Sequence, residues 1–257
     1  MRLPWLTGLF FVAIVLGLNG AVRAESITVY PDYPSADTVG VQGDYPTGWG
    51  SGSHQANGVA KSQFYWTPDG LFGRSIVLND ISNLSWWTKK DTTHDASAHD
   101  WYLHFYTQPF SGSPGSSWYG YRINSEPYFS GDLNDPAGQW NMWQTEDGED
   151  NRLRFFDSST GYFGAYDDPF LDAFQGTGTG NGDTYGEQGI LYISMATATG
   201  WADGFTGQLD GLTITLDDGT AGTVNFEPVP EPATMCLLGA GLVGLIGAAY
   251  RRKRRQG

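Results

Sequence analysis

Cys236 is the only cysteine in this chain of 257 residues, and it lies in an apolar stretch near the C-terminus. No disulfide can therefore hold together the long middle part, from residue 25 to residue 229, although an exported chain would be free to form one. About 205 residues are enough to bury a conventional core. The same part contains nine of the ten tryptophans, together with abundant glycine and short alternating runs. This composition predicts one all-β domain.

Apolar segments at both ends predict export. Arg2, an apolar run over residues 6–18 and the small-residue site at 22–24 form a signal peptide of residues 1–24. Residues 233–250 have no charge, and 18 residues of helix span about 27 Å, close to the thickness of a bilayer core. The predicted organisation is a signal peptide at 1–24, an exported β domain at 25–228 and a tail at 229–257, of which 251–257 are the basic end.

The tail has three parts in a fixed order: a Pro-Glu-Pro box, one apolar helix and a basic cluster. This arrangement resembles the PEP-CTERM sorting signal of Gram-negative bacteria, which is also labelled an ice-binding protein C-terminus. The resemblance implies export through the inner membrane, transient anchoring there, processing by an exosortase, and a final place at the cell surface or outside, often with extracellular polysaccharide. An ordinary single-pass tail anchor is the alternative. The implied sorting residues are Pro230, Glu231, Pro232, Arg251, Arg252, Lys253, Arg254 and Arg255.

The exported part is strongly acidic. Between residues 25 and 229 there are seven basic and 27 acidic side chains, a formal charge of −20. Such a surface repels nucleic acid, and no basic stripe is present to bind a phosphate backbone. Acidity favours solubility, and it also tolerates bound cations.

Period-two patterns place the expected strands. Residues 212–216 alternate most clearly. Residues 101–107 also alternate, with Trp101, Leu103 and Phe105 on one face and Tyr102, His104 and Tyr106 on the other. We expect a loop over 31–58, a hairpin turn at 146–150, a helical turn within 168–174, a flexible loop at 176–182 and a tight turn at 217–220. The expected strands, about ten in all, include residues 26–30, 74–78, 84–88, 101–107, 118–123, 139–145, 152–156, 190–195, 212–216 and 223–226.

The end of the domain also has a recognisable pattern. A Gly-rich turn leads to Asp210, an alternating apolar strand follows, and Asn225-Phe226-Glu227-Pro228 ends the domain. This block is similar to the closing strands of secreted concanavalin/laminin-G-like domains. The resemblance implies an antiparallel two-sheet jelly-roll sandwich, a fold frequent in carbohydrate-binding modules.

No pattern predicts catalytic residues. The dense carboxylate pairs, Glu146 with Glu149 and Asp167 with Asp168, lack the spacing along one strand face that a glycosidase needs. The histidines His54, His94, His99 and His104 do not share one face, and no zinc-binding motif is present. A Gly-x-Ser-x-Gly nucleophile motif is also missing.

Oxygen-rich loops make calcium the better metal hypothesis, because hard cations bind carboxylates and loop carbonyls. Plain turn chemistry would explain the same residues, so a structural calcium ion is possible rather than required. The candidate ligands are Asp132, Asn134, Asp135, Glu146, Asp147, Glu149, Asp150 and Asp210.

Aromatic rings next to polar loops suggest glycan binding, because pyranose rings stack on Trp and Tyr; core packing is the alternative for each ring. Trp86 and Trp87 must point to opposite faces if both lie in one strand. We therefore expect a non-enzymatic structural or glycan-binding surface protein, with a secreted polysaccharide-acting hydrolase as the alternative. The candidate glycan-binding residues are Trp86, Trp87, Trp118, Tyr119, Trp140 and Trp143.

Overall fold

The computed structural model describes residues 38–58, 61–91, 100–130, 136–148, 151–197 and 205–228. The signal peptide, the strand expected at 26–30 and the sorting tail lie outside these ranges. In the described part, no helix is both long and apolar enough to cross a membrane. The membrane helix predicted at 233–250 therefore stays a prediction.

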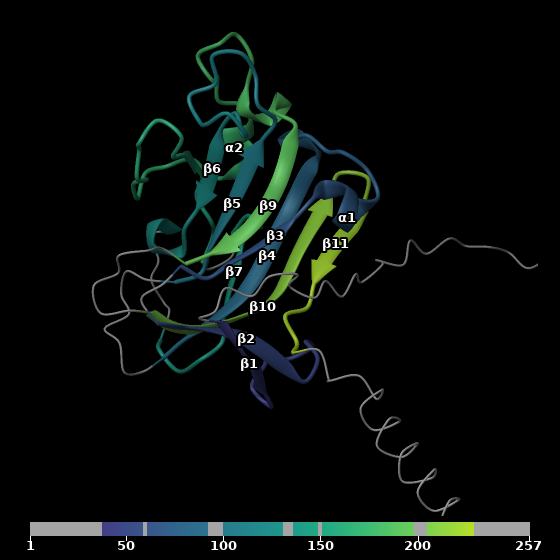
Figure 1. The fold of residues 1–257 in the computed structure, drawn as a ribbon, viewed down its shortest axis with the longest axis vertical. Helices are drawn as coiled ribbons and strands as arrows, with labels where there is room; N and C mark the ends of the chain where they lie inside the picture. The colour runs from purple at the N-terminus through teal and green to yellow at the C-terminus, as the bar shows by residue number, and fades with distance from the viewer. Residues whose placement is uncertain are drawn as a thin grey trace, which may run out of the picture.

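Two antiparallel sheets form most of the domain, and we refer to them as sheet A and sheet B (Figure 1). Sheet A has the strand order β1-β2-β10-β4-β7, with β11 also paired to β10. Strand β10 is the longest, and its two halves pair with β2 and β11 along one edge while β4 runs along the other. The strands of sheet A are β1 (Thr38–Gln42), β2 (Gly52–Gly58), β4 (Ile81–Lys90), β7 (Asn141–Gln144), β10 (Phe205–Leu216) and β11 (Ala221–Val224).

Sheet B has the order β3-β9-β5-β6-β8. Helix α1 (Pro68–Phe72) and the 3-10 turns at Leu78–Asp80 and Pro127–Ser130 lie in connections between the two sheets. Helix α2 (Leu171–Gln175) and the 3-10 turn at Tyr185–Glu187 lie between β8 and β9 of sheet B. The helical turn expected within 168–174 is confirmed as α2. The strands of sheet B are β3 (Gln63–Trp66), β5 (Tyr102–Thr107), β6 (Arg122–Ser125), β8 (Phe156–Asp157) and β9 (Ile190–Ala196).

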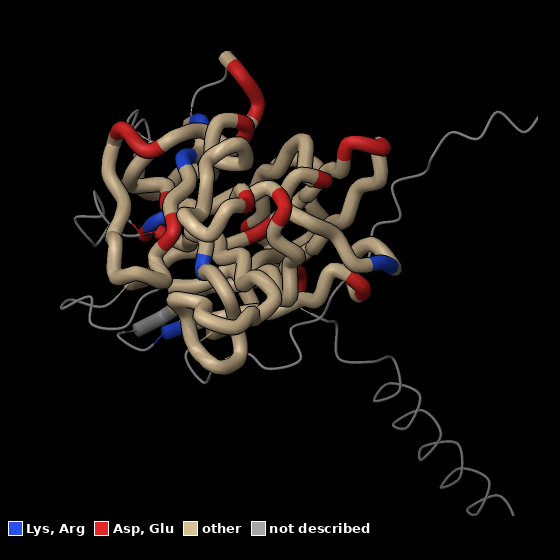
Figure 2. Tube along the Cα trace, turned by 90° about the horizontal axis from the view of Figure 1, so that it is seen from above, with Lys and Arg blue, Asp and Glu red and all other residues tan. Residues whose placement is uncertain are grey.

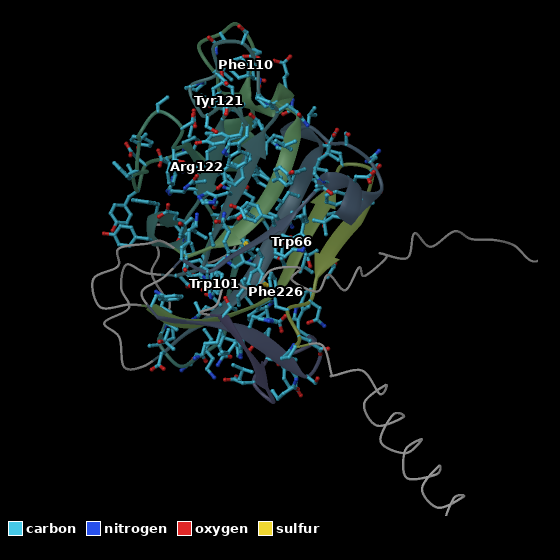
Figure 3. The ribbon with its side chains drawn as sticks, viewed as in Figure 1. Trp66, Trp101, Phe110, Tyr121, Arg122 and Phe226 are labelled. Carbon is cyan, nitrogen blue, oxygen red and sulfur yellow. The ribbon has the colours of Figure 1, made fainter. Side chains whose placement is uncertain are left out.

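One aromatic-rich core lies between the sheets. Sheet A contributes Leu84 and Trp86, and sheet B contributes Phe64, Leu103 and Phe105, all of them buried. Figure 3 shows Trp66, Trp101 and Phe226 close together in this layer, and the ring centres of Trp66 and Phe226 are 5.5 Å apart. The indole N–H of Trp101 donates to the carbonyl of Gly207 at 3.0 Å, which links the two sheets. This core replaces the missing disulfides.

The clearest sequence patterns are confirmed. Strand β5 has the predicted alternation, with Leu103 and Phe105 in the core. The turn at 217–220 joins β10 to β11, and Gly219 adopts a φ of 83°, which suits glycine. The backbone N–H of Leu216 donates to the carbonyl of Thr220 at 2.8 Å and closes this turn.

Three expectations are wrong. The loop expected over 31–58 contains β1 and β2, whose polar and glycine residues pair with one another and with β10. Residues 74–78 form only an isolated bridge at Val77 followed by a 3-10 turn, because the chain bends there between the sheets. The hairpin expected around 146–150 does not form, because the described chain returns beside β7 only in an isolated parallel bridge between Gln144 and Arg152, and β8 belongs to sheet B.

Candidate functional site

The six aromatic residues proposed for glycan binding lie in three separate places. Trp86 and Trp143 face each other across β4 and β7 and point into the core, where neither side chain is exposed. Their assignment to a sugar site is therefore wrong, because a fully buried ring cannot stack on a ligand. Trp87 points away from the core, so the expected opposite orientation of Trp86 and Trp87 is confirmed.

Trp87 and Trp140 lie on the outer face of sheet A, where Asp44 organises the polar groups. The Asp44 carboxylate accepts hydrogen bonds from Lys89 Nζ at 2.6 Å, Gln208 Nε2 at 2.9 Å and Trp140 Nε1 at 3.0 Å. Burial alone would raise the pKa of Asp44, but these three donors and the Lys89 charge outweigh it and hold the pKa below its usual value. These three side chains thus share the Asp44 carboxylate as their hydrogen-bond partner.

Trp118 and Tyr119 lie on the outer face of sheet B, in a group of rings that we call the aromatic platform: Tyr65, Tyr106, Trp118, Tyr119 and Tyr192. The ring of Tyr106 is 4.7 Å from that of Trp118 and 6.1 Å from that of Tyr65. Tyr65 is 48% exposed and Trp118 is 45% exposed. The platform therefore offers ring faces to solvent, supported from below by the buried Tyr106.

A polar pocket of about 480 Å³, which we call the sheet B pocket, lies beside the platform. Its size is within the usual range for small-molecule sites. The buried Phe156 lines the pocket, and the exposed rings of Tyr162 and Phe163, the latter 83% exposed, form its rim. Its polar lining comes mainly from β5, β6 and their flanking segments and consists of Lys61, Tyr102, His104, Arg122, Asn124, Glu126 and Ser158.

Strand register explains why these groups meet. His104 lies opposite Asn124 on β6 and Ser194 on β9, so all three side chains share the outer face of sheet B. Tyr106 lies opposite Arg122 in the same way. Figure 3 shows Arg122 on β6, apart from the core residues Trp66, Trp101 and Phe226. The pocket is thus a direct product of the alternation along β5 and β6.

Burial sets the protonation of the pocket. It raises the pKa of Glu126 to about 7, although a hydrogen bond from Asn124 and the charge of Arg122 act in the opposite direction. Burial also lowers the pKa of His104 well below its usual value, and the charges of Lys61 and Arg122 add to this effect. At neutral pH the imidazole is therefore neutral and Glu126 is divided between its acid and its carboxylate form.

The proposed calcium ligands are not gathered into a site within the described ranges. Asp147 is exposed and pairs with Arg152 at 2.8 Å, and Glu146 is exposed beside it. The described residues contain no group of three or more His, Cys, Asp or Glu side chains that could hold a metal. Asp132, Asn134, Asp135, Glu149 and Asp150 lie outside the described ranges, as do His94 and His99.

Asp210 has a structural position in β10. Its Oδ1 accepts the backbone N–H of Gly211 at 2.8 Å and that of Phe226 at 3.0 Å, so the carboxyl joins β10 to the segment after β11. Burial raises its pKa to about 7 against these two donors. Gly211 adopts a φ of 64°, and a Cβ there would lie 2.6 Å from Trp49 Cε2. A bulge in β10 at this point thus depends on both residues.

The sequence alone singled out Trp118 and Tyr119 but missed most of this face. Tyr65, Arg122, Asn124 and Glu126 have no local motif and come from different strands. The usable pattern was the alternation of 101–107, which places Tyr102, His104 and Tyr106 on one face opposite the core. Polar and aromatic residues together on a non-core face are typical of a binding surface.

Comparison with known proteins identifies the tail. Residues 228–255 match the family described as the PEP-CTERM protein-sorting motif. The motif indicates an exported protein that an exosortase sorts in association with the membrane, on its way to the cell surface. No curated protein and no solved structure matches the chain.

Proposed function

We propose that the domain is a non-enzymatic glycan-binding module of the extracellular polymer layer, and that it binds polysaccharide on the outer face of sheet B. One observation carries this proposal: exposed rings of the aromatic platform lie next to a pocket lined by hydrogen-bonding side chains. Rings bind the apolar faces of sugars, and the polar groups bind their hydroxyls.

Tyr45 provides a matched control for testing the platform, because it is 42% exposed, close to the 45% of Trp118, and lies outside the platform. The full chain in mild detergent is screened against soluble polysaccharides by affinity electrophoresis. Trp118→Ala should weaken retention by about 5- to 150-fold in affinity if its ring contributes about 1–3 kcal/mol, as a base stacked on an aromatic side chain does. Tyr45→Ala should bind as the wild type does. Equal loss in both variants would refute the proposed site.

The export route rests on the sorting motif, and we propose that Glu231 is its recognition residue. An acidic side chain held between Pro230 and Pro232 at the start of the apolar segment has a restricted backbone, which favours selective recognition. Glu231→Ala should leave the full-length precursor in the inner membrane, as detected by cell fractionation and immunoblotting. Normal release of the variant would rule out this role.

A secreted polysaccharide-acting hydrolase is the second candidate, and Glu126 is the observation that favours it. A carboxyl group with a pKa of about 7 in a pocket is suited to general acid catalysis. A glycosidase uses two carboxyl groups, whereas Glu126 is the one acidic residue in the described lining of this pocket. Release of reducing sugar by the wild type and its loss in Glu126→Gln would favour the hydrolase over the binding module.

The sandwich itself is proposed to be of the concanavalin/laminin-G-like jelly-roll type. The long closing strand β10, its turn into β11 and the position of Asp210 support this proposal. In such a fold, one sheet face bordered by loops is a natural place for a ligand. Fold type alone does not decide activity, so the test of function remains the binding experiment.

A further inference from the structure

Two cations face the sheet B pocket in a domain that is otherwise acidic. Figure 2 shows acidic positions spread around the trace, with few basic ones among them. Lys61 and Arg122 are two of only seven basic residues between residues 25 and 229, and both line this pocket. Such a gathering is unexpected in a part of the chain with 27 acidic side chains.

Basic residues elsewhere in the domain are mostly neutralised by carboxylates. Arg74 pairs with Asp218 at 2.6 Å, Lys89 pairs with Asp44 at 2.6 Å, and Arg152 contacts both Asp147 and Asp172. Lys61 makes no hydrogen bond or ion pair with any residue in the described ranges. Partial burial lowers its pKa, and the nearby charge of Arg122 lowers it further. Two like charges near each other in a pocket are costly unless an anion joins them.

Arg122 is held in position without being neutralised. Its Nε donates to Ser158 Oγ at 2.7 Å and its Nη2 donates to the carbonyl of Ser158 at 3.3 Å. The Ser158 hydroxyl also lies 2.7 Å from Asn124 Oδ1, which fixes the serine. All these acceptors are neutral, so the guanidinium is oriented while its charge stays available. A planar guanidinium is well suited to binding a carboxylate.

Glu126 only partly offsets the two cations. Its Oε1 accepts a hydrogen bond from Asn124 Nδ2 at 3.3 Å, and burial opposes its ionisation. The pocket therefore keeps a positive charge near neutral pH. The acid form of Glu126 can also donate a hydrogen bond to a second oxygen. A singly charged anion fits this set better than a phosphate monoester, whose charge of about −1.5 to −2 would be repelled more strongly by the ionised form of Glu126.

We propose that the sheet B pocket binds a carboxylate-bearing sugar unit, a uronate within an acidic polysaccharide. Lys61 and Arg122 bind the carboxylate, Asn124 and Glu126 bind neighbouring oxygens, and the rim rings Tyr162 and Phe163 cover the sugar face. This inference rests on the proposed glycan-binding function. It adds the class of ligand, which the aromatic platform alone does not define.

The test compares oligomers of equal length: oligogalacturonate, its methyl ester and a neutral β-glucan. Binding to the full chain in mild detergent is measured by calorimetry. Lys61→Met removes the charge and keeps most of the stem. Lys61→Arg restores a cation, and Arg74→Met changes the net charge equally at an exposed ion pair. The acidic oligomer should bind about tenfold more tightly than its ester, since a charged hydrogen bond contributes about 1.5–3 kcal/mol.

Lys61→Met should lose that preference, while Lys61→Arg and Arg74→Met should keep it. If the neutral oligomer binds as well as the acidic one, or if Lys61→Met keeps the preference, the uronate inference is overturned and the glycan-binding function stands. If no oligomer binds and a wider polysaccharide screen also finds no ligand, both proposals fail.

Discussion

The outer faces of the two sheets contain similar residue types but differ in how their polar groups are used. On sheet A, Asp44 binds Lys89, Gln208 and Trp140, so the charge of Lys89 is paired and all three side chains are hydrogen-bonded to one carboxylate. On sheet B, Lys61 has no carboxylate partner among the described residues, and Arg122 is bound by neutral acceptors. Large exposed rings lie next to these cations.

This difference shows that composition alone does not locate a site. Both faces have tryptophan beside charged residues, and the sequence therefore made Trp87, Trp140 and Trp118 equal candidates. What separates them is whether the polar groups have partners within the protein. Buried and half-buried polar groups are normally satisfied, so a face that leaves a charge without a partner is a candidate for ligand binding.

The largest expected change in stability comes from Trp86, whose ring lies in the core and not on the outer face of either sheet. Trp86→Ala should destabilise the domain by about 3–5 kcal/mol, because it removes a fully buried indole and leaves a cavity. Urea unfolding followed by far-UV circular dichroism measures this change. Trp118→Ala should change the free energy of unfolding by less than about 1 kcal/mol. Similar losses in the two variants would contradict the assignment of Trp86 to the core and Trp118 to the surface.

The second largest change in stability should come from Asp44 on the outer face of sheet A. Asp44→Ala leaves Lys89, Gln208 and Trp140 without their shared acceptor and should cost about 1–3 kcal/mol in the free energy of unfolding. Glycan affinity of the same variant should match the wild type. Loss of affinity with unchanged stability would mean that the outer face of sheet A, rather than that of sheet B, is the binding face.

Strands with a strong apolar period were predictable from the sequence, and strands without one were not. The alternation of 101–107 and of 212–216 gave β5 and the β10–β11 hairpin, because one face of each packs in the core. In contrast, β1 and β2 are polar and glycine-rich and exist through strand pairing. Within the described residues, β1 pairs only with β2, and β2 pairs with β10, which lies about 150 residues further along the chain, a pairing that no local pattern reveals.

The smallest expected effect concerns the protonation of Glu126. Its pKa rises from 4.5 to about 7 on folding, so the folded state disfavours the charged form. The resulting loss of stability is absent below about pH 4.5, develops between pH 4.5 and 7, and is complete above pH 7. Glu126→Gln removes this pH-dependent loss of stability. The Tm of the variant relative to the wild type should therefore rise by about 2–4 °C from pH 6 to pH 7, as expected for about 1 kcal/mol.

His104 and His54 titrate in the same range in both proteins, so the difference in Tm between variant and wild type isolates Glu126. Burial is the main cause that lowers the pKa values of both histidines. Protonation of either one therefore destabilises the folded domain as the pH falls below 6.5. A difference in Tm that stays constant between pH 5 and pH 8 would show that Glu126 ionises normally, and the protonation state assigned to the sheet B pocket would be wrong.

The candidate site was only partly predictable from the sequence, because most of its residues come from different strands and the segments beside them. Trp118 and Tyr119 stand out because they follow a Gly/Ser-rich loop. Lys61, His104 and Glu126 come together only when β5 and β6 pair and the segment before β3 reaches the same face. Their register is set by core packing on the other side of the sheet, so the site depends on tertiary structure rather than on a motif.

Hydroxyl-radical footprinting of the full chain, with and without a bound polysaccharide, compares the two faces most directly. Oxidation of exposed rings is measured residue by residue by mass spectrometry. If the outer face of sheet B is the binding surface, the polysaccharide should protect Tyr65, Trp118 and Phe163 from oxidation. Tyr45 and Trp140 should be oxidised as before. Protection of Tyr45 and Trp140, with no change at Trp118, would contradict this assignment.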